Sequence, residues 1–210
     1  MLLPHPCRGS IPGGFITLAR ITSKIRWPPR GLGLGTPLNS ALAAADTRHA
    51  FWRSLWLYLL AGVATAITMM GLDLLLFSGV SQEHVRALGA QPVLVRCLIV
   101  LYSPIIEELE FRLVFATLVA WIALFALSRL GRPSPSIAIW LSILLSALYF
   151  GLAHVGNLPN VPHPYLRAFT LDGVAGIVLG WLYWRRGLEA AIAAHLAADV
   201  FIYFGLASLL

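Results

Sequence analysis

The sequence predicts an all-α membrane protein, a polytopic bundle with about six apolar transmembrane segments. Of its 210 residues, 59% are hydrophobic and only 11% are charged, whereas soluble globular chains carry about 25% charged residues. So few charged side chains cannot cover the surface of a soluble fold of this size. Helices are the favoured spanning structure because lipid offers no water to unpaired backbone groups.

The positive charge is concentrated near the N-terminus. Residues 1–50 contain six Lys and Arg side chains and one acid, Asp46, so five of the six net positive charges lie there. Prolines and glycines interrupt this stretch, which we interpret as a disordered basic arm that precedes a membrane domain at 51–210. A basic flank beside an apolar body is typical of chains that contact anionic lipid. We therefore expect a lipid bilayer as a partner, and no nucleic acid.

Six apolar segments follow the arm, at residues 54–79, 93–106, 107–130, 136–154, 166–184 and 188–209. Five are long enough to cross a hydrocarbon core, which needs about 20 helical residues. Segment 93–106 is shorter, and it is compatible with a short span, a re-entrant piece or the first half of a helix kinked at Pro104. Gly176 and Gly180 form a GxxxG pair, which indicates close helix packing.

Charged residues inside such segments are costly and mark functional sites. The first cluster is Glu107-Glu108-Leu109-Glu110-Phe111-Arg112. Helical spacing places Glu108 and Arg112 on one face as an ion pair, and it turns Glu107 about 100° away from Glu108. Glu107 is then free to face another group. A charged loop at the membrane surface explains the same cluster equally well.

Two further clusters contain histidines. His154 ends an apolar segment, and alone it resembles an ordinary interfacial histidine. His195 and Asp199 lie one turn apart inside the last segment, where packing does not explain them, so we favour a functional role. The short link at 131–135 predicts an antiparallel hairpin that brings Glu107 beside His154. The last segment then carries His195 towards the same cavity.

The clusters resemble the three motifs of the CPBP family in order and in helical setting: Glu107-Glu108-xxx-Arg112, Phe150-xxx-His154 and His195-xxx-Asp199. This family comprises membrane proteases similar to the type II CAAX prenyl endopeptidase, and bacterial Abi relatives linked to bacteriocin processing and immunity. The resemblance covers roughly residues 90–205. It implies an endopeptidase, integral to a bacterial plasma membrane, that cleaves a membrane-associated or lipidated peptide.

The resemblance also implies residue roles and no cofactor. Glu107 would act as general base on a water that His154 helps to hold, and His195 and Asp199 would stabilise the oxyanion. Fixed donors aimed at a developing oxyanion are effective in a low-dielectric site. Three other motif positions would support the site: Glu108, Arg112 and Phe150.

Two positions depart from the family pattern. Asp199 stands where the best-studied enzymes carry asparagine, and an ionised aspartate cannot donate to an oxyanion. Asp199 must therefore be protonated, or it acts by orienting His195. Leu113 follows Arg112 where a glycine is common, and we expect this bulkier residue to narrow the site.

Two other classes of function stay open. The first is a metal-dependent protease, because Glu107, His154, His195 and Asp199 have the ligand chemistry that zinc prefers. The HExxH signature of zinc proteases is absent from the sequence, however. The second is a non-catalytic membrane immunity or scaffold protein that keeps the same fold.

The remaining charged residues have simpler expected roles. Asp73 and Asp172 should each pair with an arginine or a backbone donor across the bundle, and Arg96 should extend towards the membrane surface. Four histidines are expected in loops or in the arm, where they would be solvated: His5, His49, His84 and His163.

Overall fold

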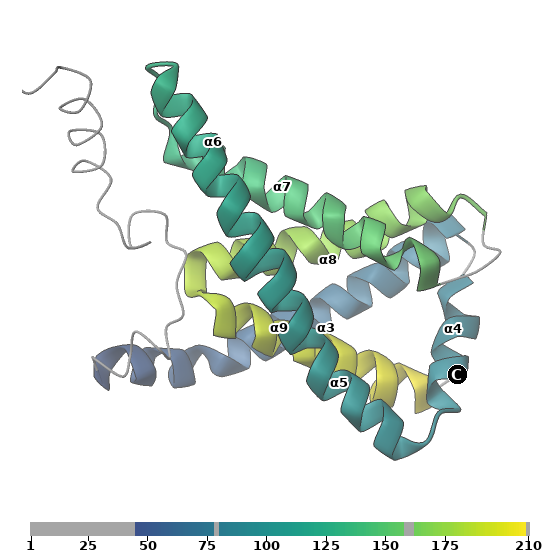
Figure 1. Ribbon diagram of the computed structural model, residues 1–210. Helices are drawn as coiled ribbons and strands as arrows, with labels where there is room; N and C mark the ends of the chain where they lie inside the picture. Colours follow the sequence, from purple (N-terminus) through teal and green to yellow (C-terminus); the bar gives the residue numbers. More distant parts are fainter. Residues whose placement is uncertain (1–44, 78–79, 158–161, 209–210) are drawn as a thin grey trace, which may run out of the picture. The chain divides into compact units, whose positions relative to one another are not determined.

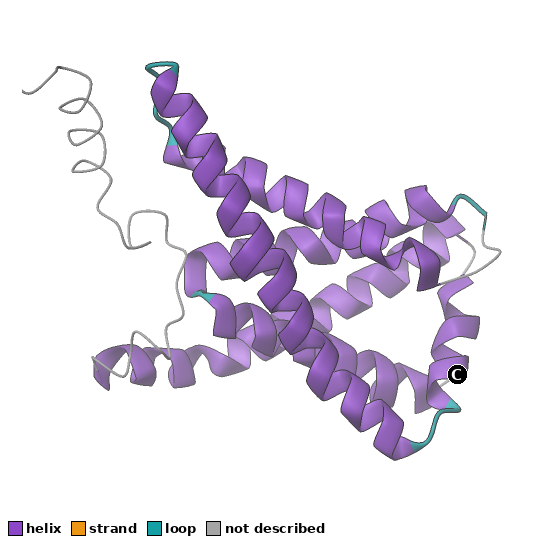
Figure 2. Ribbon diagram, in the orientation of Figure 1, coloured by secondary structure: helices purple, strands orange, loops and turns teal. Residues whose placement is uncertain are grey.

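The computed structural model describes residues 45–77, 80–157 and 162–208, and within these ranges the chain is helical apart from short turns, with no strand (Figure 2). Five helical stretches there are long and apolar enough to cross a membrane: Phe51–Phe77, Val93–Arg129, Pro135–His154, Pro164–Arg186 and Leu188–Gly205. The predicted all-α transmembrane bundle is therefore confirmed. Most of the expected basic arm, residues 1–44, lies outside the described residues.

The two apolar segments 93–106 and 107–130 belong to one continuous helical stretch (Figure 1). It consists of α5 (Val93–Glu108), the π-helical η2 (Leu109–Ala116) and α6 (Thr117–Arg129). Pro104 lies inside α5 without ending it. Of the alternatives for 93–106, the first part of a longer helix is the one that the structure adopts.

The π-helical segment η2 displaces backbone carbonyls, and side chains satisfy two of them. Ser146 donates a hydrogen bond to the carbonyl of Phe111 at 2.8 Å, and Thr117 donates to the carbonyl of Arg112 at 3.2 Å. Ser146 is completely buried. Single π turns inside α-helices often coincide with functional sites, and this one follows directly on Glu107 and Glu108.

The other helices are α3 (Ala45–Phe77), α4 (Val80–Gly89), α7 (Pro135–His154), α8 (Pro164–Arg186) and α9 (Leu188–Val200), with 3₁₀ turns η3 (Val155–Asn157) and η5 (Leu206–Ser208) and the π turn η4 (Phe201–Gly205). The expected antiparallel hairpin of α6 and α7 forms (Figure 1). Gly131 turns the chain with a φ of 72°, and the Ser134 side chain caps α7. The end of α7 thereby lies beside the middle of the long helix.

Glycines allow two helix pairs to approach closely, α7 with α8 and α3 with α9. A Cβ atom at Gly176 would lie 2.7 Å from Cα of Ala147, and one at Gly180 would lie 3.2 Å from Ile143. The GxxxG pair thus has the packing role expected of it. The tightest approach is at Gly62 of α3, where a Cβ atom would lie 1.9 Å from the carbonyl oxygen of Ala194 in α9.

Candidate active site

Glu108 and Arg112 form the predicted i,i+4 ion pair, with both side chains completely buried. Oε2 of Glu108 lies 3.2 Å from Nε of Arg112, although the atoms lack hydrogen-bond alignment. The guanidinium also stands 4.7 Å above the ring of Phe150. The surface-loop alternative for this cluster is therefore wrong, because the pair lies inside a helix and in the interior of the bundle.

Glu108 has a second partner that the sequence did not reveal, His195 of α9. Oε1 of Glu108 lies 2.9 Å from Nδ1 of His195. An ionised carboxylate only accepts hydrogen bonds, so Nδ1 carries the proton. This bond fixes the ring so that its other nitrogen, Nε2, faces the cavity.

His154, at the end of α7, is held in a similar way. Its Nδ1 lies 2.7 Å from the carbonyl oxygen of Phe150, and a carbonyl can only accept, so this Nδ1 also carries the proton. The Phe150 ring packs against both imidazoles, with ring centroids 4.5 Å from His154 and 5.8 Å from His195. Nε2 of His154 is left to face Glu107.

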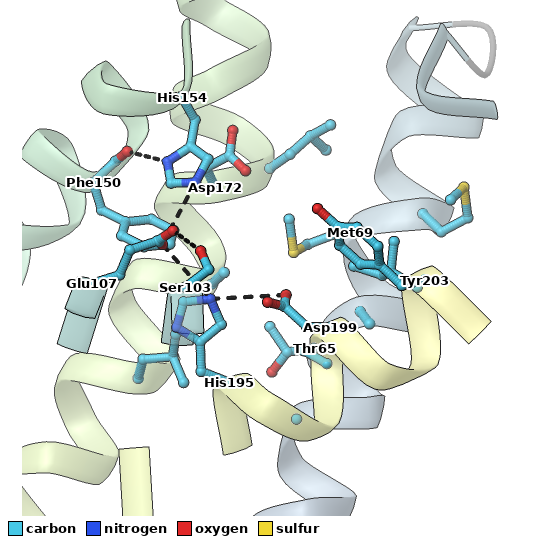
Figure 3. Close-up of a pocket in the computed structure, with 18 of the residues that line it drawn as sticks. Thr65, Met69, Ser103, Glu107, Phe150, His154, Asp172, His195, Asp199 and Tyr203 are labelled. Carbon is cyan, nitrogen blue, oxygen red and sulfur yellow. Dashed lines mark hydrogen bonds and ion pairs between the residues drawn. The ribbon is translucent and has the colours of Figure 1, made fainter. Parts of the chain in front are cut away.

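Glu107 lies between the two histidines (Figure 3). Its Oε1 accepts a hydrogen bond from the hydroxyl of Ser103. Its Oε2 lies 3.7 Å from Nε2 of His154 and 3.8 Å from Nε2 of His195. These separations are too long for direct hydrogen bonds, and Oε2 has no hydrogen-bond partner in the described part of the chain. One carboxylate oxygen and two imidazole nitrogens therefore converge on a single region.

Asp199 also faces this region, but its contact with His195 is loose. Its Oδ1 lies 3.9 Å from Nε2 of His195, which exceeds hydrogen-bond distance. Because Glu108 already fixes the His195 ring at Nδ1, Asp199 is not needed to orient it. Glu108, and not Asp199, therefore makes the hydrogen bond that holds the His195 ring.

All four residues line one cavity of about 230 Å³. Its walls come from α3, α4, α5, α7, α8 and the α9–η4 stretch. Other polar side chains also line it, among them His84, Ser103, Arg167 and Asp172, and apolar side chains complete the lining, among them Met69, Met70, Val85, Leu88 and Ile202. The cavity therefore combines a compact group of titratable side chains with an apolar region.

A family model for the type II CAAX prenyl endopeptidase, Rce1-like, matches residues 89–201, more than half of the chain. The chain belongs to this family. No curated protein and no solved structure matched it. The matched region contains all three sequence clusters, and it therefore includes the four cluster residues that line the cavity. The Rce1-like chain is accordingly an integral membrane protein of a protease family.

Two single-residue expectations for this Rce1-like protein, those for His84 and Leu113, were wrong. His84 is not solvated in a loop: it lies on α4, lines the cavity and is half-buried. Burial and, secondarily, the charge of Arg167 lower its pKa. Arg96 donates a hydrogen bond to the carbonyl of Tyr203 in the last helical stretch at 2.9 Å, and its extension towards the membrane surface stays a prediction. Leu113 is 39% exposed and does not line the cavity, so it does not narrow the site.

Other expectations agree with the structure of the Rce1-like chain. Asp73 is completely buried and accepts a hydrogen bond from Arg167 at 3.0 Å. His49 and His163 are exposed, and His5 lies outside the described residues. Asp172 lines the cavity near His154 (Figure 3), a position that its isolated place in the sequence did not indicate.

The four candidate zinc ligands, Glu107, His154, His195 and Asp199, share the cavity without forming a coordination shell. Across residues 45–77, 80–157 and 162–208, no group of three or more His, Cys, Asp or Glu side chains is arranged to hold a metal ion. Instead, both histidine Nδ1 atoms are occupied by protein acceptors.

Proposed function

We propose that this Rce1-like protein is an intramembrane endopeptidase in which Glu107 activates a water that attacks a peptide bond. The substrate would be a lipidated or membrane-associated peptide. The observation that carries the proposal is the convergence of Glu107 Oε2 with two imidazole Nε2 atoms, 3.7 and 3.8 Å away. Polar atoms separated by such distances around an unpaired buried oxygen suit a bridging water.

Glu107 and His154 can hold both hydrogens of one water. With Nδ1 protonated, a neutral His154 presents the lone pair of Nε2. The carboxylate oxygen of Glu107 accepts the second hydrogen. The lone pairs of the water oxygen are then available to a substrate carbonyl carbon. As the new C–O bond forms, the water proton passes to Glu107.

The tetrahedral intermediate carries an oxyanion, which His195 and Asp199 would stabilise. Since Nδ1 of His195 donates to Glu108, Nε2 donates only when the ring carries both protons. Asp199 donates only when it is protonated. Collapse of the intermediate breaks the C–N bond, and Glu107 returns the proton to the leaving amine. No cofactor takes part in these steps.

The test uses purified protein in lipid nanodiscs with a fluorescence-quenched, farnesylated peptide that ends in a CAAX sequence. Glu107→Gln should lower kcat at least about a hundredfold, because an amide cannot accept the water proton. Glu110→Gln is the matched control. Glu110 belongs to the same cluster, yet it is exposed and is hydrogen-bonded to Tyr149 outside the cavity.

Three outcomes would contradict the proposal. Full activity of Glu107→Gln would exclude Glu107 as the base. About one equivalent of bound zinc, with activity lost to a chelator, would support the metal-dependent alternative. No cleavage by the wild type, together with an unchanged cellular phenotype of Glu107→Gln, would support the non-catalytic immunity or scaffold protein.

A further inference from the structure

Ser103 lines the cavity but belongs to none of the three sequence clusters. It lies on α5, one helical turn before Glu107, and its side chain is partly buried. Its hydroxyl donates a hydrogen bond to Oε1 of Glu107 (Figure 3). Because an ionised carboxylate only accepts, the proton of this bond belongs to Ser103.

The direction of this hydrogen bond is unusual for a helical hydroxyl. Ser and Thr inside helices commonly donate to the backbone carbonyl one turn earlier. Five other helical hydroxyls among the described residues do so, at 2.7–2.8 Å: Thr65, Thr68, Ser128, Ser142 and Thr170. The Ser103 hydroxyl instead points forward along the helix to a side chain. Ser103 therefore differs from these five hydroxyls in having a side-chain acceptor, Glu107.

The bond divides the two oxygens of the Glu107 carboxylate. Ser103 occupies Oε1, whereas Oε2 faces the two imidazole nitrogens and has no hydrogen-bond partner among the described residues. The terminal torsion of a glutamate is soft, so the carboxylate plane turns readily without an external contact. A hydrogen bond to one oxygen removes that freedom.

We infer that Ser103 is a positioning residue for the general base: it holds the Glu107 carboxylate so that Oε2 faces both Nε2 atoms and receives the water proton. This inference rests on the proposed function of Glu107. Ser103 itself contacts neither the water nor the substrate carbonyl in this scheme. Its effect should therefore appear in turnover and not in substrate binding.

The first test is kinetic and uses the farnesylated peptide in nanodiscs. Ser103→Ala should lower kcat about tenfold to a hundredfold, the loss typical of a misplaced catalytic group, with KM changed less than twofold and an unchanged melting temperature. Ser103→Thr keeps the hydroxyl and should recover most of kcat. Ser128→Ala, which removes a helical hydroxyl bonded to a backbone carbonyl, should leave kcat unaffected.

The second test needs no substrate. Infrared difference spectra of protein containing ¹³C-labelled glutamate should show a shifted carboxylate stretch between Ser103→Ala and wild type. The same comparison in a Glu107→Gln background should show no such band, because the carboxylate that Ser103 binds is gone. A band that persists in that background would overturn the assignment of Glu107 as the partner.

The outcomes separate this inference from the proposed function. If Glu107→Gln is inactive while Ser103→Ala has wild-type kcat, the positioning role is wrong and the general base stands. If Glu107→Gln is fully active, the proposed function fails, and the positioning role fails with it. The infrared band would then show only that Ser103 binds Glu107. Covalent labelling of Ser103 by a fluorophosphonate, with complete inactivity of Ser103→Ala, would identify a serine nucleophile and overturn the inference.

Discussion

Glu108 orients His195 through a hydrogen bond of 2.9 Å between its Oε1 and Nδ1 of the ring. The neighbouring carboxylate, Glu107, faces the opposite nitrogen of the same ring at 3.8 Å. Two adjacent glutamates therefore contact one imidazole from two sides. The buried one is paired with Arg112, and the one that faces the cavity is not. Their expected mutant phenotypes differ accordingly.

Removal of either member of the buried ion pair should destabilise the protein. Glu108→Ala and Arg112→Ala each leave a buried charge without its partner, which costs on the order of 3–5 kcal/mol. Glu107→Ala breaks no such pair and should leave thermal unfolding in detergent nearly unchanged while it abolishes turnover. Equal loss of melting temperature in all three variants would show that the two glutamates are not specialised in this way.

Asp199→Asn should retain cleavage activity within a few fold of wild type. Since Glu108 already orients His195, we expect Asp199 to act as a hydrogen-bond donor to the oxyanion, a role that asparagine can take over at every pH. The variant should then keep activity at alkaline pH, where an ionised aspartate no longer donates. Peptide-cleavage rates of both proteins, measured over a series of acidic to alkaline buffers, test this.

Asp199→Ala is the control for that prediction, because it removes the donor altogether and should lower kcat. A loss of tenfold or more in Asp199→Asn at all pH values, equivalent to about 1.4 kcal/mol, would instead support an orienting charge on Asp199.

Gly62→Ala should strongly destabilise the fold. The added Cβ would lie 1.9 Å from the carbonyl oxygen of Ala194, so α3 and α9 would have to separate, and overpacking of this kind costs about 1–3 kcal/mol or more. Gly71→Ala is the matched control in the same helix, since no described neighbour lies within 4 Å of its added Cβ. Similar melting temperatures for the two variants would contradict the close approach of α3 and α9.

Acidification should destabilise the protein in part through His84. Burial and the charge of Arg167 lower the pKa of this ring in the folded state from its usual 6.5. Below pH 6.5 the unfolded chain therefore binds the proton more readily, so the free energy of unfolding falls as the pH decreases through this range. His84→Gln removes this contribution, and its melting temperature should fall less than that of wild type between about pH 7 and pH 5. An equal fall of the melting temperature with pH in the two proteins would exclude His84 as the source of the acid destabilisation.

The hydropathy of the sequence was sufficient to predict the helical spans, because the bilayer requires long apolar segments whatever their partners are. The Glu108–Arg112 pair was equally predictable, since an i,i+4 contact depends on helix geometry alone. The continuity of α5, η2 and α6 could not be predicted, because a proline in a helical sequence is compatible with both a kink and the end of the helix.

The second contact of Glu108 could not be read from the sequence, since it joins residues 87 positions apart. The sequence does not distinguish Ser103 from other helical serines, because its hydrogen bond to Glu107 depends on the side-chain rotamer. The sequence predicts His84 in a loop or in the arm, whereas tertiary packing places α4 against the cavity. Local rules thus predicted contacts within one helix, such as Glu108 with Arg112, but not the contacts between helices.

The stretch from Val93 to Arg129 contains 37 residues, which corresponds to a helix about 55 Å long. A hydrocarbon core is about 30 Å thick, so an upright helix of this length projects far beyond it, and the mismatch is relieved by tilt or by local thickening of the lipid. Glu107 and Ser103 lie on this helix, whereas His154 and His195 lie on shorter ones. Bilayer thickness should therefore strain the helix that carries the proposed base, Glu107, and we expect the proposed cleavage rate to depend on the acyl-chain length of the lipid.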